Sequence, residues 1–274
     1  GFDLVNRLLR DRRLGREVLH VTTREALGWP DRSEHVKPFY DVEAHSLLER
    51  EPPVHTRLRT LVNRAFVSRA IERLRPRVTA LAHELIDGFE ADRKVDLLSR
   101  FATPIPVIVI AELLGVPTDM ADELLDWSHR MVAMYQFNRT RAVEDDAVAA
   151  TQAFVAFMRG YVDERRRRPA DDLISSLIAA EEAGDRLSTD ELITTCILLL
   201  NAGHEATVHA IGNGVKALLE NRIDPRIAFA SPSQTEATAD ELIRFDAPLA
   251  HAVEVQRLIA GRVLAGRTGI VLAA

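Results

Sequence analysis

The chain has 274 residues with a formal net charge of −6, and 47% of its residues are hydrophobic. This length is enough for a large domain with a sizeable core, and the mild acidity argues against a general nucleic-acid binder. No apolar run approaches the ~20 residues that a membrane-spanning helix needs, so we expect no membrane partner. The chain opens without a secretory leader, and its single cysteine, Cys196, excludes an intramolecular disulfide. Together these features favour a protein of the reducing cytoplasm.

The first part of the chain predicts one short helix followed by a polar stretch. Residues 2–9 have an amphipathic pattern, whereas residues 20–45 combine prolines, histidines and charged side chains. We expect residues 20–45 to be loop with short helical pieces. His35 and His45 have no spacing typical of a metal site, and we interpret both as solvated loop residues.

A better-defined helix is predicted to begin near Val54, after the Pro52-Pro53 pair. Its apolar positions repeat at helical spacing, as Leu58, Leu61, Val62 and Ala65. His55 and Arg59 are four residues apart and therefore share one face. They are interpreted either as two solvated basic residues or as an anion site that both residues form together.

The middle of the chain predicts several further helices. Their expected ranges are 69–92, 104–114, 118–134, 139–168 and 171–183. The run rich in valine and isoleucine at 104–114 could also pass for a strand. Its Leu113-Leu114-Gly115 ending and the following Pro117 favour a buried helix instead.

The longest predicted helix covers residues 187–221. Ser188 and Glu191 form a capping-box pattern at its start, and the apolar run Leu192–Leu200 predicts burial on most sides. Its middle, residues 201–207, is small and polar and includes glycine, histidine and glutamate. A glycine inside a helix costs about 1 kcal/mol relative to alanine, and burying His or Glu costs more unless they are paired. We therefore expect something to be bound against this point of the helix.

The end of the chain differs in character from the rest. Residues 221–237 predict a loop and residues 238–246 a short helix, whereas the alternation and glycines at 253–272 suggest strands. The predicted fold class is therefore mainly α, a helical domain built around the long central helix. Only a small β portion is begun at the C-terminus.

Three segments now stand in a recognisable order. They are Pro52-Pro53-Val54-His55-Thr56-Arg57-Leu58-Arg59, Ala202-Gly203-His204-Glu205-Ala206-Thr207 and Glu241-Leu242-Ile243-Arg244. Their order and spacing resemble the bacterial class I cytochrome P450 family. The resemblance covers nearly the whole chain, and it implies that residues 1–274 form a single P450-like domain that is incomplete at both ends.

The resemblance implies a haem cofactor and gives roles to individual residues. His55 and Arg59 would hold a haem propionate, and Ala202 and Gly203 would lie over the distal haem face. Glu205 resembles the acidic residue that the family uses in proton delivery. Glu241 and Arg244 resemble the structural ExxR pair of the family, although an ordinary surface salt bridge one helical turn apart remains the alternative.

Two departures from the family pattern stand out. The family usually has threonine at the position of Ala206, whereas here the hydroxyl follows one residue later at Thr207. Either Thr207 and a water molecule take over this role, which makes Thr207 a candidate catalytic residue, or oxygen activation is altered. The family's iron is held by a cysteine thiolate in a loop well after the ExxR helix, and the chain ends at Ala274 before such a loop. We expect no metal ligand in this chain, because Cys196 lies in a buried apolar run.

The implied function is that of a haem-thiolate monooxygenase, which inserts one oxygen atom from O2 into an apolar small molecule. The alternative is a non-catalytic P450-like fragment, or a helical binding protein, that lacks the haem ligand. A zinc hydrolase is rejected because His204 and His209 are five residues apart and their rings point away from each other.

The resemblance also implies an electron donor, a ferredoxin or a flavodoxin-like protein. No flavin or iron–sulfur segment occurs in the sequence to replace such a partner. We expect exposed arginines such as Arg57 and Arg64, in the region of the helix that carries His55 and Arg59, to contribute to the docking surface.

Overall fold

The computed structural model describes residues 1–11, 15, 17–19, 21–66, 68–136, 138–180 and 184–246. This part of the chain is helical and contains no strand, which confirms the mainly α prediction. The β portion expected at 253–272 lies outside the described residues. Among the described helices, none combines the length and apolar character that a bilayer crossing requires.

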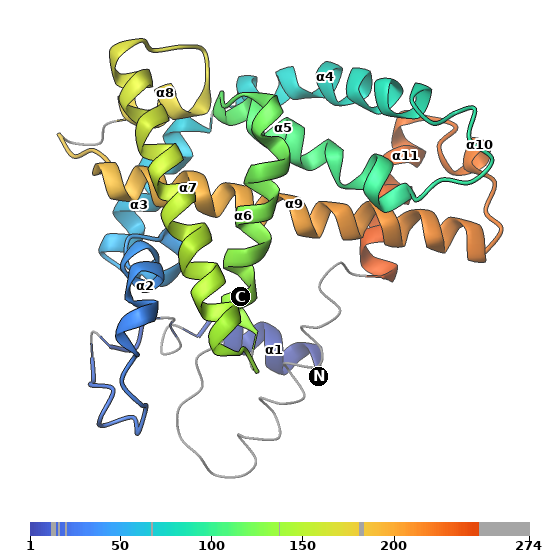
Figure 1. Cartoon of the computed structure of the whole chain (residues 1–274). Coiled ribbons are helices and arrows are strands. Elements are labelled where there is room, and N and C mark those ends of the chain that lie inside the picture. The colour runs from blue at the N-terminus through green and yellow to red at the C-terminus, as the bar shows by residue number, and fades with distance from the viewer. Residues whose placement is uncertain are drawn as a thin grey trace. The chain divides into compact units, whose positions relative to one another are not determined.

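The helices follow one another in the order shown in Figure 1. They are α1 (Phe2–Leu9), α2 (Lys37–Glu43), α3 (Val54–Ala65), α4 (Ser68–Asp87), α5 (Pro104–Leu114), α6 (Ala121–Val132), α7 (Arg141–Arg167), α8 (Leu173–Ala179), α9 (Thr189–Glu220), α10 (Pro225–Ala228) and α11 (Pro232–Phe245). Short 3-10 turns cover Glu34–Val36, Leu47–Glu49, Thr118–Met120 and Ala133–Tyr135, and a π-helical turn covers Leu98–Ala102.

The chain divides into two compact units. Unit 1 contains the described residues among 1–66 and 126–198, and unit 2 contains those among 67–125 and 199–246. The chain passes from one unit to the other between α3 and α4, within α6 and within α9. The single domain expected over residues 1–274 stays a prediction.

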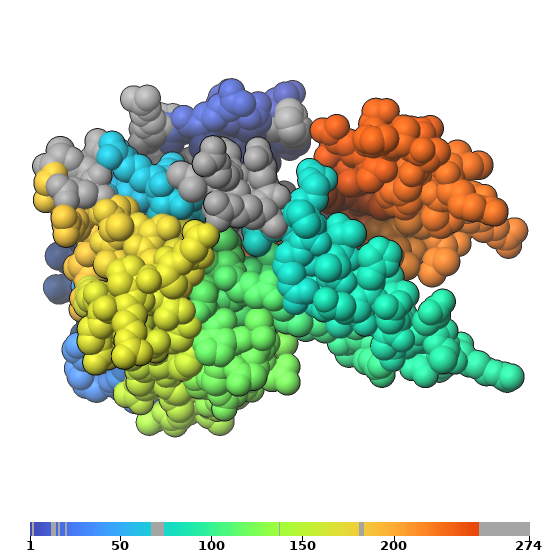
Figure 2. Space-filling model, turned by 90° about the horizontal axis from the view of Figure 1, so that it is seen from above, coloured from blue at the N-terminus to red at the C-terminus, as the bar shows by residue number. Residues whose placement is uncertain are grey.

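Unit 1 is organised around α7, which contacts α2 and α8. Its buried residues recur three or four positions apart, as Ala147, Ala150, Thr151, Phe154, Met158 and Val162. This spacing is the apolar stripe of a helix that packs on one side, and Figure 2 shows the side chains of α8 lying against those of α7. The predicted stripe of α3 is buried as well, and α3 packs on α8.

Unit 2 contains α4, α5, α11 and the second part of α9. Arg77 of α4 binds Glu112 of α5 through Nε at 2.9 Å, which holds these two contacting helices together. The helix predicted at 104–114 is confirmed, and Gly115 ends it with the positive φ of 85° that glycine adopts without steric cost. The end of α11 is bound to α9: Asn213 Nδ2 of α9 donates to the carbonyl oxygen of Asp246, the residue that follows α11, at 3.3 Å.

Two expectations for loops were wrong. The loop predicted at 221–237 contains α10 and the start of α11, because the Ser231 hydroxyl caps α11 by accepting from the amide of Gln234. His35 is not a solvated loop residue: it is half-buried, and its Nε2 lies 2.7 Å from Glu144 Oε2. His45 is exposed, as expected.

Candidate functional site

The start of α9 forms as predicted. The amide of Glu191 donates to Ser188 Oγ at 3.2 Å, and the amide of Ser188 donates to Glu191 Oε2 at 2.8 Å, which is a reciprocal capping box. The apolar run that follows is buried, with Leu192, Ile193, Ile197 and Leu200 each at most 2% exposed. The helix then enters unit 2 just before the small and polar residues.

The middle of α9 exposes one face lined by small side chains. Ala202 is exposed, and Glu205 and Ala206, three and four residues later on the same face, are half-buried. The carboxylate of Glu205 has no hydrogen bond or ion pair with any residue of the described ranges. The helix is therefore open at this face, directly after a run that is buried.

Gly203 faces a different neighbour. A Cβ atom at Gly203 would lie 2.5 Å from Cδ1 of Ile110 in α5, closer than real Cβ contacts come. The absence of a side chain at Gly203 therefore allows α9 to approach α5 closely within unit 2. A contact of Ala202 or Gly203 with haem stays a prediction.

The polar residues around Gly203 are bound mainly to their own helix. His204 is 1% exposed, and its Nδ1 donates to the carbonyl oxygen of Leu200 at 2.9 Å. The hydroxyl of Thr207 donates to the carbonyl oxygen of Gly203 at 3.1 Å. His209 is exposed whereas His204 is buried, so these histidines do not share the environment that one zinc ion would require.

Asn201 was not singled out from the sequence. Its Oδ1 is buried and has no hydrogen-bond partner among the described residues. An unsatisfied buried acceptor costs roughly 1–3 kcal/mol, so a donor from outside these residues is expected at this atom. The only signal in the sequence was an asparagine directly after a long apolar run.

His55 and Arg59 lie on α3 in unit 1. His55 is half-buried and Arg59 is exposed, and neither side chain forms a hydrogen bond or ion pair within the described part of the chain. Both side chains can therefore bind an anion, while the opposite side of α3 is buried. His55 and Arg59 belong to unit 1, whereas Ala202–Thr207 belong to unit 2.

Arg57 differs from its two neighbours on α3, because it is not the exposed arginine that we expected. Its Nη2 binds Glu191, its Nε lies 3.5 Å from Asp185 Oδ2, and its side chain is only 29% exposed. Arg57 thus ties α3 to the start of α9 within unit 1. A contribution of Arg57 or Arg64 to a docking surface for an electron donor stays a prediction.

The ExxR residues form a direct pair on α11. Arg244 Nε donates to Glu241 Oε2 at 2.6 Å and Arg244 Nη2 donates to Oε1 at 2.5 Å, and both side chains are largely exposed. The hydrogen bond from Arg244 lowers the pKa of Glu241. Leu242 of the same helix packs beside Gly214 of α9, which joins the two motif-bearing helices inside unit 2.

Cys196 is fully buried, and burial raises the pKa of its thiol to about 12. A thiol in this environment stays protonated near neutral pH, whereas a metal ligand must be a thiolate. The interpretation of Cys196 as a core residue agrees with this environment.

The comparisons with known proteins agree with the motif order. The family model described as Cytochrome P450 matches residues 15–223. The chain belongs to the cytochrome P450 family. Its relatives include the vitamin D(3) 25-hydroxylase of Pseudonocardia autotrophica, 41% identical over 74% of this chain and 49% of that protein. The polyketide biosynthesis cytochrome P450 PksS of Bacillus subtilis is 35% identical over 88% of this chain and 57% of that protein.

Solved P450 structures share the fold. A crystal structure of P450BioI, in complex with hexadec-9Z-enoic acid ligated acyl carrier protein, matches with a TM-score of 0.79 and 29% identity over 90% of this chain and 62% of that chain. The structure of PksS matches with a TM-score of 0.74 and 32% identity over 88% of this chain and 57% of that chain. The P450 chain spans about half the length of the curated relatives it matches.

Proposed function

We propose that this P450 chain belongs to a haem-thiolate monooxygenase that inserts one oxygen atom from O2 into an apolar small molecule. The family membership carries the proposal. Haem, when bound, supplies the oxygen chemistry, and the protein would orient the substrate and deliver protons. The names of two relatives, a vitamin D(3) 25-hydroxylase and a polyketide biosynthesis P450, support an apolar substrate.

The exposed face of α9 supports a haem contact. Ala202 and Ala206 are small enough to let a flat group approach the helix. Gly203 lies beside Ala202, but its missing side chain leaves room for Ile110 of α5, so a haem contact of Gly203 rests on the family resemblance alone. Glu205 lies on the same face, and its carboxylate has no hydrogen bond or ion pair with the described residues, which is compatible with the role in proton delivery that the family resemblance implies. Thr207 donates its own proton to the helix, so its oxygen would act as an acceptor for water.

The α3 pair supports a propionate site. His55 and Arg59 are one helical turn apart and have no counter-charge among the described residues, which is an arrangement suited to a carboxylate. In the complete protein the iron ligand would come from a residue other than Cys196. Glu241 and Arg244 would be the structural ExxR pair on α11. A ferredoxin or a flavodoxin-like protein would deliver electrons. The protein would act in the cytoplasm.

A haem titration of the 274-residue chain tests the cofactor site. The variant His55→Gln/Arg59→Gln should raise the apparent Kd for haem at least about tenfold, because a charged hydrogen-bonded pair contributes more than 1 kcal/mol. Arg64→Gln on the same helix is the matched control and should leave the Kd unchanged. Equal affinities for all three proteins would show that His55 and Arg59 do not bind the haem propionate.

The reaction class needs a second measurement on the protein extended by the downstream residues of its gene. A thiolate-type carbon-monoxide difference spectrum, together with oxygenation of an apolar substrate, is the expected result. Haem bound without that spectrum would favour the alternative of a non-catalytic binding protein.

A further inference from the structure

A cavity of about 390 Å³ lies in unit 1, between the polar stretch after α1 and the start of α7. Its walls include the side chains of Arg24, Trp29, Arg32, Tyr40, Arg139 and Glu144. Small-molecule pockets commonly begin near 300 Å³, so the space suits a small organic ligand better than a lone ion. None of these residues belongs to the haem-contacting motifs.

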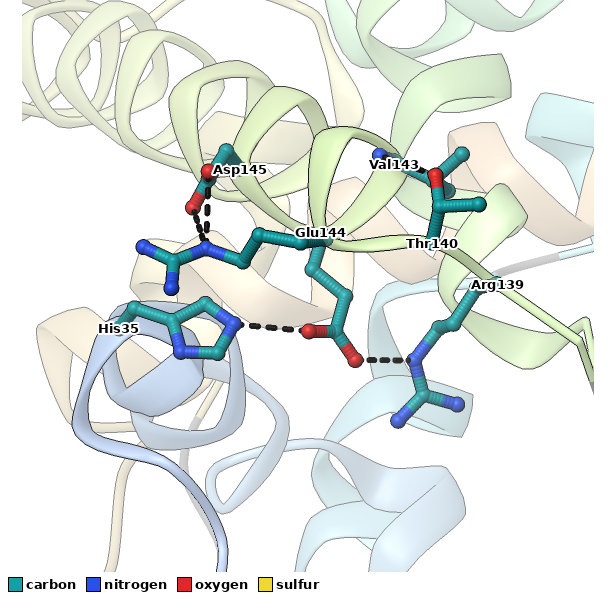
Figure 3. A network of polar contacts seen from close by, with 7 residues as sticks. His35, Arg139, Thr140, Val143, Glu144 and Asp145 are labelled. Atoms are coloured by element: carbon teal, nitrogen blue, oxygen red, sulfur yellow. Dashed lines mark hydrogen bonds and ion pairs between the residues drawn. The ribbon is translucent and has the colours of Figure 1, made fainter.

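The wall formed by α7 is held in place by one carboxylate. Glu144 Oε2 accepts from His35 Nε2 at 2.7 Å, and Glu144 Oε1 accepts from Arg139 Nε at 2.9 Å (Figure 3). Both oxygens of Glu144 are thus occupied, and the charge of Arg139 is balanced within the wall. This carboxylate and this guanidinium are therefore part of the scaffold of the cavity.

Arg24 shapes the opposite wall. Its Nε and Nη2 donate to the carbonyl oxygen of Pro30 at 3.0 and 2.6 Å, and its guanidinium lies over the ring of Trp29 at 5.6 Å from the centroid. These contacts fold the 24–30 segment onto itself. No carboxylate of the described residues neutralises the positive charge of Arg24.

Among the arginines and the glutamate that line the cavity, Arg32 has the fewest polar contacts. Its guanidinium stacks on the ring of Tyr40 at 3.5 Å from the centroid, yet it forms no hydrogen bond or ion pair within the described ranges. Partial burial lowers the pKa of Arg32, and the charge of Arg24 acts in the same direction, whereas Tyr40, Glu49 and Glu43 favour its charged form. An arginine stays charged in proteins, so five N–H donors remain available for an anion.

We propose that this cavity binds a small aromatic or aliphatic carboxylate, with the guanidinium of Arg32 as its principal anchor. The planar guanidinium matches a carboxylate with two parallel hydrogen bonds, and Arg24 adds a second positive charge. The rings of Trp29 and Tyr40 offer apolar contact to the remainder of the ligand. A phosphate ion would satisfy the same charges but not the aromatic walls. The site goes beyond the monooxygenase function and does not depend on haem.

Tryptophan fluorescence tests the site directly, because the chain has 2 tryptophans and one of them, Trp29, lines the cavity. A Trp127→Phe background leaves Trp29 as the only tryptophan, and benzoate is the probe. We expect a saturable fluorescence change with benzoate, and inorganic phosphate should bind at least about tenfold more weakly because it gains nothing from the rings. Equal affinities for phosphate and benzoate would overturn the assignment to an organic carboxylate.

Substitution of the anchor completes the test. Arg32→Gln should weaken benzoate binding at least about tenfold, and Arg32→Lys, which keeps the charge but not the paired donors, should fall between the two proteins. Arg168→Gln, an exposed arginine outside the cavity, is the control and should bind as the parent does. Unchanged binding in Arg32→Gln, or no saturable binding to a parent protein whose circular dichroism shows it to be folded, would refute the site.

Discussion

Cδ1 of Ile110 occupies the space that a side chain at Gly203 would need: an added Cβ would lie 2.5 Å from it and 3.5 Å from Cγ1 of the same isoleucine. A side chain at Gly203 would therefore require this atom of α5 to move. The contact with Ile110 gives the glycine in the middle of α9 a neighbour inside unit 2. Gly214, further along α9, has only an ordinary contact, 3.4 Å from Leu242 Cδ1.

The two glycines should respond differently to alanine. Gly214→Ala should raise the free energy of unfolding by up to about 1 kcal/mol, since alanine is the better helix former. Gly203→Ala gains the same propensity, but Cδ1 of Ile110 must move to make room for the new Cβ, and the cost of that shift offsets part of the gain. Gly203→Ala should therefore stabilise the protein less than Gly214→Ala, and urea unfolding of both variants measures the difference.

A second substitution identifies the atom responsible. Ile110→Val deletes Cδ1 and alone should cost about 0.5–1.5 kcal/mol. In the Gly203→Ala background the same substitution should cost less than alone, or even stabilise, because the overlap is removed. Strictly additive effects would show that the two residues do not compete for this space.

The pair of Arg57 and Glu191 gives a prediction for unit 1. Glu191 uses Oε2 to accept from the amide of Ser188 and Oε1 to bind Arg57, so Glu191→Gln can keep the cap while losing the charge. Their side chains are 29% and 13% exposed, which is more buried than a typical surface pair. A double-mutant cycle with Arg57→Met should give a coupling of about 1 kcal/mol.

The single variant Arg57→Met also bears on electron transfer. If Arg57 serves only to tie α3 to α9, Arg57→Met should lower stability and leave the salt dependence of reduction by a donor protein unchanged. A loss of donor affinity at unchanged stability would show that Arg57 contributes to the docking surface.

The sequence predicted those features of the fold that depend on neighbours along the chain. The buried stripe of α3, the capping box of α9 and the choice of helix for α5 each rest on residues within one or two turns. The start of α11 carries a local capping signal in Ser231 and Gln234, but the prolines and serines around it are equally typical of a loop, so the pattern predicts the wrong structure there.

Contacts between distant residues could not be predicted in this way. His35 and Glu144 are separated by 109 positions, and no local pattern pairs a loop histidine with one glutamate of a distant helix. The contact between Ile110 and Gly203 is of the same kind. The motif order predicted the family correctly, whereas the roles of His55, Arg59 and Glu205 rest on a resemblance that only experiments with haem can test.

The thiol of Cys196 should not react with a maleimide in the folded protein. Its thiol is buried with a pKa raised to about 12, so labelling by a maleimide should require unfolding. The labelling rate should rise with urea in parallel with the unfolded fraction. In a Cys196→Ala background, Ser233→Cys places a thiol at an exposed position and should react at once. Fast labelling of native Cys196 would contradict its assignment to the core.

The stability of unit 1 should fall in acid because of Glu144. The hydrogen bond from His35 lowers the pKa of Glu144, and Arg139 acts in the same direction against the opposing effect of burial. A carboxyl group whose pKa is lower in the folded state stabilises the protein at pH values above its unfolded pKa of about 4.3. This contribution is lost as the pH falls through the lower folded value.

Glu144→Gln should therefore reduce the free energy of unfolding by roughly 1–3 kcal/mol near neutral pH, because two charge-assisted hydrogen bonds are weakened. The difference from the parent should shrink below about pH 4, where the parent carboxylate also becomes neutral. Glu241→Gln is the control: its pKa is lowered as well, but its pair with Arg244 is exposed, so its effect on stability should be small. Urea unfolding of the three proteins across this pH range measures the effect, and a Glu144→Gln deficit that stayed constant with pH would mean that the charge of Glu144 contributes nothing to folding.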